Sequence, residues 1–531
     1  MPSIRTSKVV QTWAHTSRIH EATSRGERVA TVRRNILSNL AGGVWIAVLT
    51  LAIIPLQVNI LGVEAYGLLG FIATLQMILS VFDLGLSSTV TRELAADHSP
   101  GRQRSRPLLR TTATIYWGLA AGVGISLWLS AGAIARFWFH PQQIDIQLLA
   151  QGLRVIALYL ALRWPVALYA GILAGSQRLD LLNGVKVATA SLRLIGGIVV
   201  LLVWRDLSLF LWWTAVNAIV EVIAYAWACR KNFPDMDWRP GLFPQALQEV
   251  WRYSIRMSAI SVLALLITQL DRLIVSKLLS LESFGYYSLA YNTAAGVSVI
   301  LSAISAAMLP SFAAADGSGS RDLLLRRYDH ANQVMLFCVG FPVLALIFFG
   351  EPILRVWVNP DAAAGAYQPM TFLAAGFWLG AATSNAYSVA LACRRPGLPL
   401  KVSLVSAIPY ALGLYWLTSV YGANGAAAAW MTLNLVYVLV LVPTVHRFLL
   451  DIPVVPWFLR TFMPFLLLGC ATFGITRLAF DRWFSAMGLT QLVAALTFAV
   501  FAFGALGYRL LSVEIRADLL GIFRRVAGIQ A

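Results

Sequence analysis

The chain has 531 residues, of which 59% are hydrophobic and 12% charged, with a formal net charge of +17. Outside its apolar runs, no segment is long enough to build a sizeable core, which excludes a large soluble catalytic domain. The basic excess is spread over short loops between apolar runs. It therefore indicates membrane topology rather than nucleic-acid binding.

Fourteen apolar runs follow one another along the chain. Each is long enough to cross the ~30 Å hydrocarbon core of a bilayer as a helix, the form that satisfies its own backbone hydrogen bonds without water. The expected spans are residues 36–60, 66–90, 108–134, 147–174, 180–203, 207–229, 253–276, 284–312, 331–350, 366–392, 398–420, 424–446, 457–480 and 490–510. The sequence therefore predicts an all-α polytopic membrane protein with about 14 transmembrane helices.

Basic residues fall on alternate sides of these spans. If the N-terminus is cytoplasmic, 31 of the 41 Lys and Arg residues lie on cytoplasmic segments. The six on the opposite side are Arg136, Arg205, Lys277, Arg355, Arg477 and Arg482. This bias predicts that both ends are cytoplasmic. The first run lacks a small-residue cleavage site, so we expect an uncleaved span after a basic tail.

A weak internal repeat has an offset of 218 residues. Gly62–Gly67 after the first span corresponds to Ser280–Gly285 after the seventh, and Tyr169 corresponds to Tyr387. Two six-helix lobes of the same orientation would be related by a pseudo-two-fold axis along the membrane normal, around a central cavity. The expected parts are a basic tail (1–35), an N-lobe (36–229), an amphipathic linker (230–252), a C-lobe (253–446), two further helices (457–510) and a C-terminal tail (511–531).

Polar residues form two stripes within the spans. Gln76, Ser80, Asp83 and Ser87 have the spacing of one helical face in the second span. In the eighth span the corresponding stripe is Tyr287, Tyr291, Ser298, Ser302 and Ser305. We expect both stripes to line the cavity. The alternative is contact between helices, since small polar residues also hold membrane helices together.

Ionisable residues inside a bilayer are costly and indicate function. Here they are Asp83, Arg154, Arg163, Arg193, Glu221, Asp271 and Arg272. At the matching positions of the other repeat, Asp83 meets Leu301 and Asp271 meets Ile53. The charges are therefore not required to build the helical bundle, which favours a functional role.

Arg163, Arg193 and Arg272 are candidate ligands of an anionic substrate, because a guanidinium binds phosphate oxygens in a bidentate way. Pairing with an acid such as Glu221 is the alternative for the first two. Arg154 lies near a span end, where it can extend to the interface. Asp271, Glu221 and Asp83 are candidates for coupling to protons or sodium, with structural ion pairs as the alternative.

Other classes of site lack a signature. No P-loop motif is present, which argues against ATP hydrolysis. Neither disulfides nor a zinc site are indicated by the four scattered cysteines, Cys229, Cys338, Cys393 and Cys470. Without a long outer loop, a membrane glycosyltransferase or ligase is disfavoured. We expect no enzyme activity, no metal and no cofactor beyond an ion gradient.

Several short runs resemble the polysaccharide transporter family. They are Arg34–Leu40, Leu61–Gly67, Phe82–Ser88 and Arg92–Ala95, and the resemblance extends over the whole length, including an amphipathic lead-in at Gly241–Met257. That family holds O-antigen and exopolysaccharide repeat-unit flippases, in a superfamily with multidrug extrusion transporters and lipid II flippases. The resemblance implies a bacterial inner-membrane protein that moves an undecaprenyl-pyrophosphate-linked oligosaccharide by ion-coupled alternating access.

Under this hypothesis, Arg163, Arg193 and Arg272 offset the pyrophosphate charge in one cavity, and Trp164, Tyr287 and Tyr291 contact sugars. The expected partners are the polyprenyl-linked glycan, membrane lipids and other polysaccharide assembly proteins. One alternative is a multidrug or small-solute antiporter of the same superfamily, in which acids would dominate. Another is a glycosyltransferase or ligase that depends on an outer-loop acid or histidine.

Overall fold

The computed structural model describes residues 42–80, 83, 85–97, 105–234, 239–243, 265, 267–484 and 488–526. Within these ranges the secondary structure is helical, with no strand, so the all-α fold class is confirmed. The predicted basic tail, most of the predicted linker and the first half of the seventh span lie outside the described residues.

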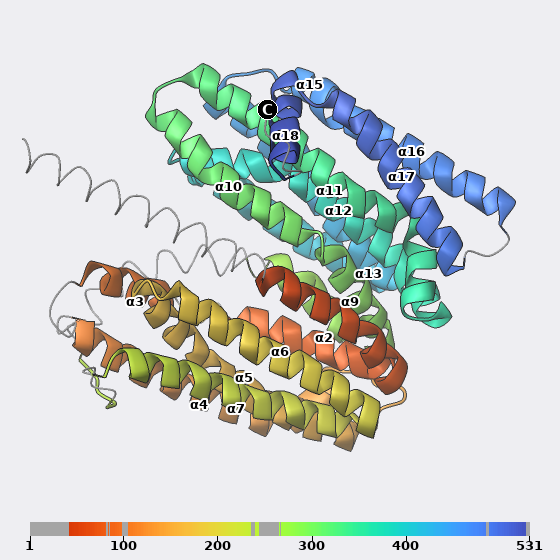
Figure 1. The fold of residues 1–531 in the computed structure, drawn as a ribbon. Helices are drawn as coiled ribbons and strands as arrows, with labels where there is room; N and C mark the ends of the chain where they lie inside the picture. Colours follow the sequence, from red (N-terminus) through yellow and green to blue (C-terminus); the bar gives the residue numbers. More distant parts are fainter. Residues whose placement is uncertain are drawn as a thin grey trace, which may run out of the picture.

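Two groups of helices lie beside one another (Figure 1). The N-terminal group contains the helix Gly42–Leu61, α2 (Val63–Ser80), α3 (Leu86–Ala96), α4 (Arg106–Phe137), α5 (Ile146–Gly175), α6 (Leu179–Trp204) and α7 (Leu207–Asn232). The second group contains a helix over 267–278, α9 (Leu281–Ala295), α10 (Ser298–Gly317), α11 (Arg321–Trp357), α12 (Pro360–Ala392), α13 (Gly397–Val436) and α14 (Val442–Val445). Against it lie α15 (Val454–Trp457), α16 (Met463–Trp483), α17 (Leu489–Leu510) and α18 (Val513–Val526).

Eleven helices in the described part of the chain are long and apolar enough to cross a membrane, which confirms a multi-pass membrane protein. One of them, Gly397–Leu450, has 54 residues and contains a non-helical residue at Gly422, where φ is +59°. That residue lies between the predicted spans 398–420 and 424–446. The predicted limits of spans three to six agree with α4 to α7 to within three residues. The total of fourteen spans stays a prediction.

The second predicted span is not one helix. It ends at Ser80 and resumes as α3 after Gly85, whose φ of +69° favours glycine. The Gly85 carbonyl accepts the backbone amide of Thr89 at 3.0 Å and the hydroxyls of Ser88 and Thr89 at 2.7 and 3.0 Å. The prediction that Gln76 and Ser87 share one helical face is therefore wrong, because the face argument assumed an unbroken helix.

The eighth span has no break of this kind. A turn at Gly296 and Val297 separates α9 from α10, but both residues keep right-handed helical angles, and Leu281–Gly317 counts as one membrane-length helix. Ser298, Ser302 and Ser305 follow this turn, whereas the tyrosines of the predicted stripe precede it. The offset of 218 relates Gly85 to Ala303 and not to Gly296, so the break and the turn are not equivalent positions of the repeat.

The two groups meet where α2 crosses α9, through a symmetrical pair of glycines. A Cβ added to Gly67 would lie 2.6 Å from the carbonyl oxygen of Leu281, and one added to Gly285 would lie 2.1 Å from that of Val63. The offset of 218 relates Gly67 to Gly285 and Val63 to Leu281. Each half therefore places a glycine on the same carbonyl of the other half, as a pseudo-two-fold axis requires.

Hydrogen bonds reinforce this contact. Asn292 Nδ2 donates to Tyr66 Oη at 2.9 Å, and Asn59 Nδ2 donates to the Val358 carbonyl at 3.0 Å. The amide of Leu281 donates to the His140 carbonyl at 3.1 Å. All of these residues lie at the end of the molecule that carries the predicted outer loops. We call this set, with Gly67 and Gly285, the outer contact.

Glu64 fixes the loop beside the outer contact. It is buried, and its carboxylate accepts hydrogen bonds from three successive backbone amides, those of Gln142, Gln143 and Ile144. Charge-assisted bonds of this kind are strong. The repeated motif therefore supplies both a glycine for the helix crossing and an acid that holds the connection into α5.

We expect Gly285→Ala to lower the stability of the purified protein by about 1–3 kcal/mol, because the added methyl group overlaps a backbone oxygen that cannot move alone. Thermal unfolding in detergent measures this. Gly122→Ala is the matched control, since nothing lies within 4 Å of a Cβ at Gly122 and alanine is the better helix former. Equal melting temperatures for the two variants would contradict the close crossing.

Candidate functional site

Two of the predicted charged residues converge on one tyrosine in the N-terminal group. The hydroxyl of Tyr159 accepts hydrogen bonds from Arg163 and Arg193, each at 3.2 Å, and donates to Gln76 Oε1 at 3.2 Å. Arg163 also pairs with Glu221 at 3.4 Å. Helices α2, α5, α6 and α7 thus contribute to one polar cluster, which we call the Tyr159 cluster.

The charges in the Tyr159 cluster do not cancel. Glu221 is the one carboxylate within ion-pair distance of its guanidiniums among the described residues, and it pairs with Arg163. No described carboxylate pairs with Arg193. The two guanidinium nitrogens lie at most twice 3.2 Å apart through the shared hydroxyl. Like charges this close repel one another, so the cluster keeps a net positive charge that an anion would neutralise.

Two cavities flank the cluster. One of about 380 Å³ is lined by Gln76, Ser80, Asp83, Arg163 and Trp164, among others. A smaller one of about 160 Å³ is lined by Gln76, Tyr159 and Arg193 with apolar neighbours. Gln76 faces both cavities, so the Gln76–Tyr159 hydrogen bond forms a partition with one arginine on each side.

Asp83 lies in the break between α2 and α3. Its Oδ2 accepts a hydrogen bond from Ser87 Oγ at 2.6 Å, while Oδ1 is buried with no partner among the described residues. Because Asp83 and Arg163 line the same cavity, the larger cavity contains both a carboxyl group and a guanidinium group. Three members of the predicted stripe thus line this cavity, Gln76 and Ser80 from α2 and Asp83 from the break.

The other predicted residues form a separate cluster in the second group. Asp271 is fully buried and accepts a hydrogen bond from Tyr287 Oη at 2.6 Å, while its Oδ1 has no partner among the described residues. The Arg272 guanidinium lies 3.6 Å from the centre of the Tyr291 ring, a cation–π contact. Asp271 and Arg272 form no ion pair with each other, as their adjacent positions on a helix predict.

The prediction of three arginines in one cavity is wrong for this structure. Arg272 is 8% exposed and does not line either cavity of the Tyr159 cluster. Tyr287 is fully buried and its hydroxyl is bound to Asp271, so it is not exposed to a sugar. Trp164 does line the larger cavity. Arg154 is exposed and lies over the Trp128 ring at 5.3 Å, as expected of an interfacial residue.

Tyr159 was not among the predicted site residues. It lies four residues before Arg163, which places both side chains on one face of α5. This spacing is the feature of the sequence that could have identified Tyr159. Tyrosine is common in membrane helices, so its type alone carried no information. In the described residues, no group of three or more His, Cys, Asp or Glu side chains is placed to hold a metal ion.

This fold is that of a known class of membrane transporters. The lipid II flippase MurJ in an inward closed conformation superposes with a TM-score of 0.66 at 13% identity, covering 89% of this chain and 99% of that one. An inward-facing multidrug resistance MATE family transporter gives 0.59 at 15% identity, covering 78% and 94%. At these identities the likeness shows that the fold is shared.

The chain belongs to the polysaccharide biosynthesis protein family, whose profile matches residues 32–315. A curated Shigella flexneri protein assigned as an O-antigen transporter is 21% identical over 375 residues, covering 70% of this chain and 87% of that protein. The sequence-based resemblance is thus confirmed. The family and these similar proteins are transporters and flippases rather than enzymes, which confirms the prediction of a non-enzyme.

We expect Tyr159→Phe to lower the free energy of unfolding by about 1–3 kcal/mol, because both arginines lose a shared acceptor in a buried site. Thermal unfolding of the purified protein measures the change. Tyr415→Phe is the control, since Tyr415 is 56% exposed. If both variants melt at the same temperature, the tyrosine does not hold the cluster together.

Proposed function

We propose that this chain is a flippase that moves a polyprenyl-pyrophosphate-linked oligosaccharide across the bacterial inner membrane, for O-antigen or exopolysaccharide synthesis. One observation supports this most directly: Arg163 and Arg193 both bind the Tyr159 hydroxyl, and each lines a cavity. Among the described residues, only one carboxylate, that of Glu221, is available to the two arginines, and it pairs with Arg163. Family membership and the similarity to an O-antigen transporter agree with it.

The two-chamber arrangement suits a substrate with two linked phosphates. Each arginine faces its own cavity across the Gln76–Tyr159 partition, and guanidinium groups bind phosphate oxygens in a bidentate way. Trp164 in the larger cavity offers an aromatic surface for a sugar. A cationic drug would meet net positive charge here, which disfavours the multidrug antiporter alternative.

The outer contact supports an inward-open resting arrangement. With both termini cytoplasmic, as the distribution of basic residues predicts, the crossing of Gly67 and Gly285 closes the outer side. The cavities near Arg163 and Arg193 would then receive substrate from the inner leaflet. Alternating access follows if the outer contact opens while the inner ends of the two groups approach each other.

Arg163→Ala and Arg193→Ala are each expected to lower glycan export by about tenfold or more, because a buried anion would lose its charged partner. Surface glycan and the amount of inserted protein are both measured. Arg154→Ala is the matched control, since its side chain is exposed against Trp128. Normal export by both cluster variants would remove the phosphate-binding role.

Coupling to a proton or sodium gradient is assigned to Asp271, with Glu221 and Asp83 as the other candidates. Asp271 is fully buried and has one carboxylate oxygen without a partner in the described part. A buried carboxylate in this state calls for a proton or a cation. Glu221 is already paired with Arg163, and Asp83 lies in the substrate cavity, so both suit coupling less well.

In proteoliposomes with an imposed proton or sodium gradient, we expect wild-type transport of a labelled lipid-linked glycan to follow the gradient. Asp271→Asn keeps the side-chain shape but removes its charge, so its transport should not respond. Asp361→Asn, at an exposed position in the first turn of α12, should respond as the wild type does. Continued gradient-driven transport by the Asp271 variant would assign coupling to another residue.

A further inference from the structure

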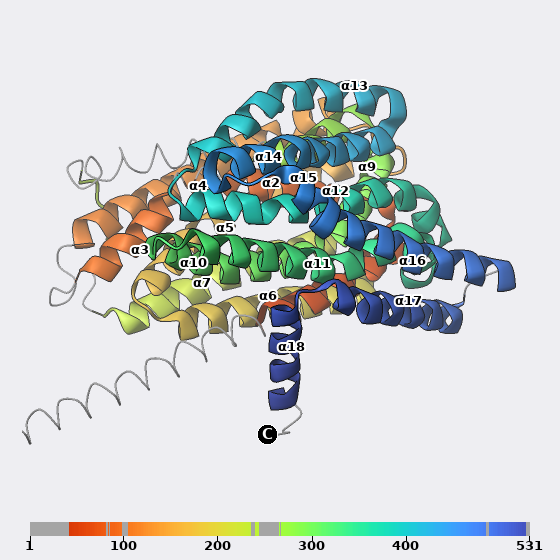
Figure 2. The ribbon, with the colours of Figure 1, turned by 90° about the horizontal axis from the view of Figure 1, so that it is seen from above.

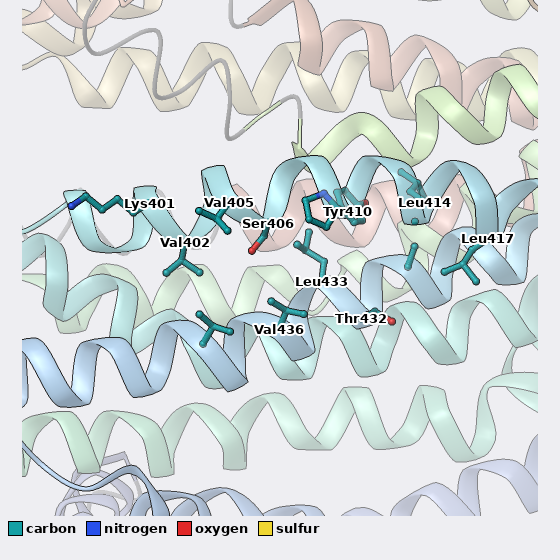
Figure 3. Close-up of a pocket in the computed structure, with 14 residues that line it drawn as sticks. Lys401, Val402, Val405, Ser406, Tyr410, Leu414, Leu417, Thr432, Leu433 and Val436 are labelled. Atoms are coloured by element: carbon teal, nitrogen blue, oxygen red, sulfur yellow. The ribbon is translucent and has the colours of Figure 1, made fainter.

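An apolar groove of about 460 Å³ lies between the two arms of the chain on either side of the Gly422 bend (Figure 3). The first arm contributes residues from Lys401 to Leu417, and the second contributes residues from Ala429 to Val440. The lining is mostly aliphatic, and Val405 is 77% exposed. We call this the α13 groove. No part of the Tyr159 cluster lines it.

The α13 groove has a charged end. Lys401 is the one charged residue in the lining that the structure describes, and it lies at one end of the groove, apart from Leu414 and Leu417 (Figure 3). Arg394 and Arg395 stand in the turn just before α13, and both are exposed. Three cations within eight residues favour an anionic head group at that end, while the rest of the groove favours hydrocarbon.

The length of the groove indicates what kind of chain fits. From Lys401 to Leu417 the helix rises about 24 Å at 1.5 Å per residue. One leaflet contributes only about half of the ~30 Å hydrocarbon core, so the groove extends past the depth that an ordinary acyl chain fills. It is also a single groove, whereas a phospholipid carries two chains. A long, single polyprenyl chain matches both features.

Part of the α13 groove lies near Asp271 and Tyr287. Tyr410 lines the groove, is 6% exposed, and its hydroxyl has no hydrogen-bond partner among the described residues. Tyr410 is in the neighbourhood of Tyr287 and Asp271. A chain in the groove would therefore lie near the residue proposed for ion coupling.

We propose that the α13 groove binds the polyprenyl chain of the carrier lipid, with the phosphate held by Lys401, Arg394 and Arg395. The identity of the lipid rests on the proposed function, while the groove and its charged end do not. One phosphate cannot contact both sets of cations at once, so the groove would be a binding position separate from the one at Arg163 and Arg193 in the N-terminal group.

Gly413 offers a way to block the groove. It lines the groove, and nothing lies within 4 Å of a Cβ placed there. Gly413→Phe therefore adds a ring at the groove, starting from a Cβ that meets no neighbour. Gly118→Phe on α4 is the matched control, because that position is equally open and outside the groove. Both full-length proteins are purified and exposed to undecaprenyl phosphate, and the bound lipid is counted by native mass spectrometry.

The wild type and Gly118→Phe should bind undecaprenyl phosphate, while Gly413→Phe should bind it at least tenfold more weakly. Lys401→Gln should weaken binding less, since two arginines remain. A tenfold excess of dioleoyl phosphatidylglycerol should not displace the lipid from the wild type. Displacement by the phospholipid would overturn the single-chain assignment. Unchanged binding by Gly413→Phe, or no binding by the wild type, would show that the groove has another occupant.

The outcome is separable from that of the proposed function. If Gly413→Phe loses the lipid while Arg163→Ala and Arg193→Ala export normally, the groove stands and the phosphate role of the cluster fails. If Gly413→Phe binds and exports normally while the arginine variants do not export, the groove proposal fails alone. Folding of each variant is checked by its melting temperature.

Discussion

The crossing of α2 over α9 decides how the two halves of this protein are placed. Glycine at 67 and 285 lets each helix backbone rest on a carbonyl oxygen of the other, and the pairs obey the same offset of 218 residues that the sequence repeat has. In a membrane, where association of helices depends on close packing rather than on the hydrophobic effect, such a contact holds two lobes together at one end. The spacing of the two groups at the opposite end (Figure 1) and access to the cavities beside α5 depend on this crossing. Seen from above, the two groups overlie one another (Figure 2).

Charge is distributed unevenly between the halves. In the N-terminal group, two arginines share one tyrosine, and one of them is paired with an acid. In the second group, Asp271 accepts a hydrogen bond from Tyr287, and Arg272 makes a cation–π contact with Tyr291. Binding of an anionic head group and coupling to a cation would therefore take place in different lobes. The two halves are joined at the outer contact, where Asn292 of the second group donates one hydrogen bond to Tyr66 of the N-terminal group.

The sequence was enough to predict the parts that depend on hydrophobicity and spacing. Apolar run length located α4 to α7, because the thickness of a bilayer sets the length of a span. The repeat indicated the paired glycines, and the lone charges indicated Arg163, Arg193 and Glu221. The sequence did not reveal the break at Gly85 or the turn at Gly296, because the apolar residues around each glycine continue the hydropathy signal of the span. The prediction grouped Arg272 with the other two arginines, because the spacing of residues along one helix does not show which part of the other lobe a side chain contacts. Tyr159 has no charge, so no rule on intramembrane charges selected it.

The break at Gly85 gives the two parts of one span different neighbours. Above it, α2 is bound to α9 of the opposite half. Beyond it, α3 lies against α5, where Gly171 and Gly175 allow the backbone of Ser87 and Thr91 to approach and Thr91 Oγ1 donates to the Gly171 carbonyl at 3.1 Å. A tilt of α2 with its partner would thus be absorbed at the glycine and would leave α3 in place. Because Asp83 sits inside this joint, any such tilt would change the distance between its carboxylate and Arg163, and the shape of the larger chamber would follow the movement of the opposite lobe.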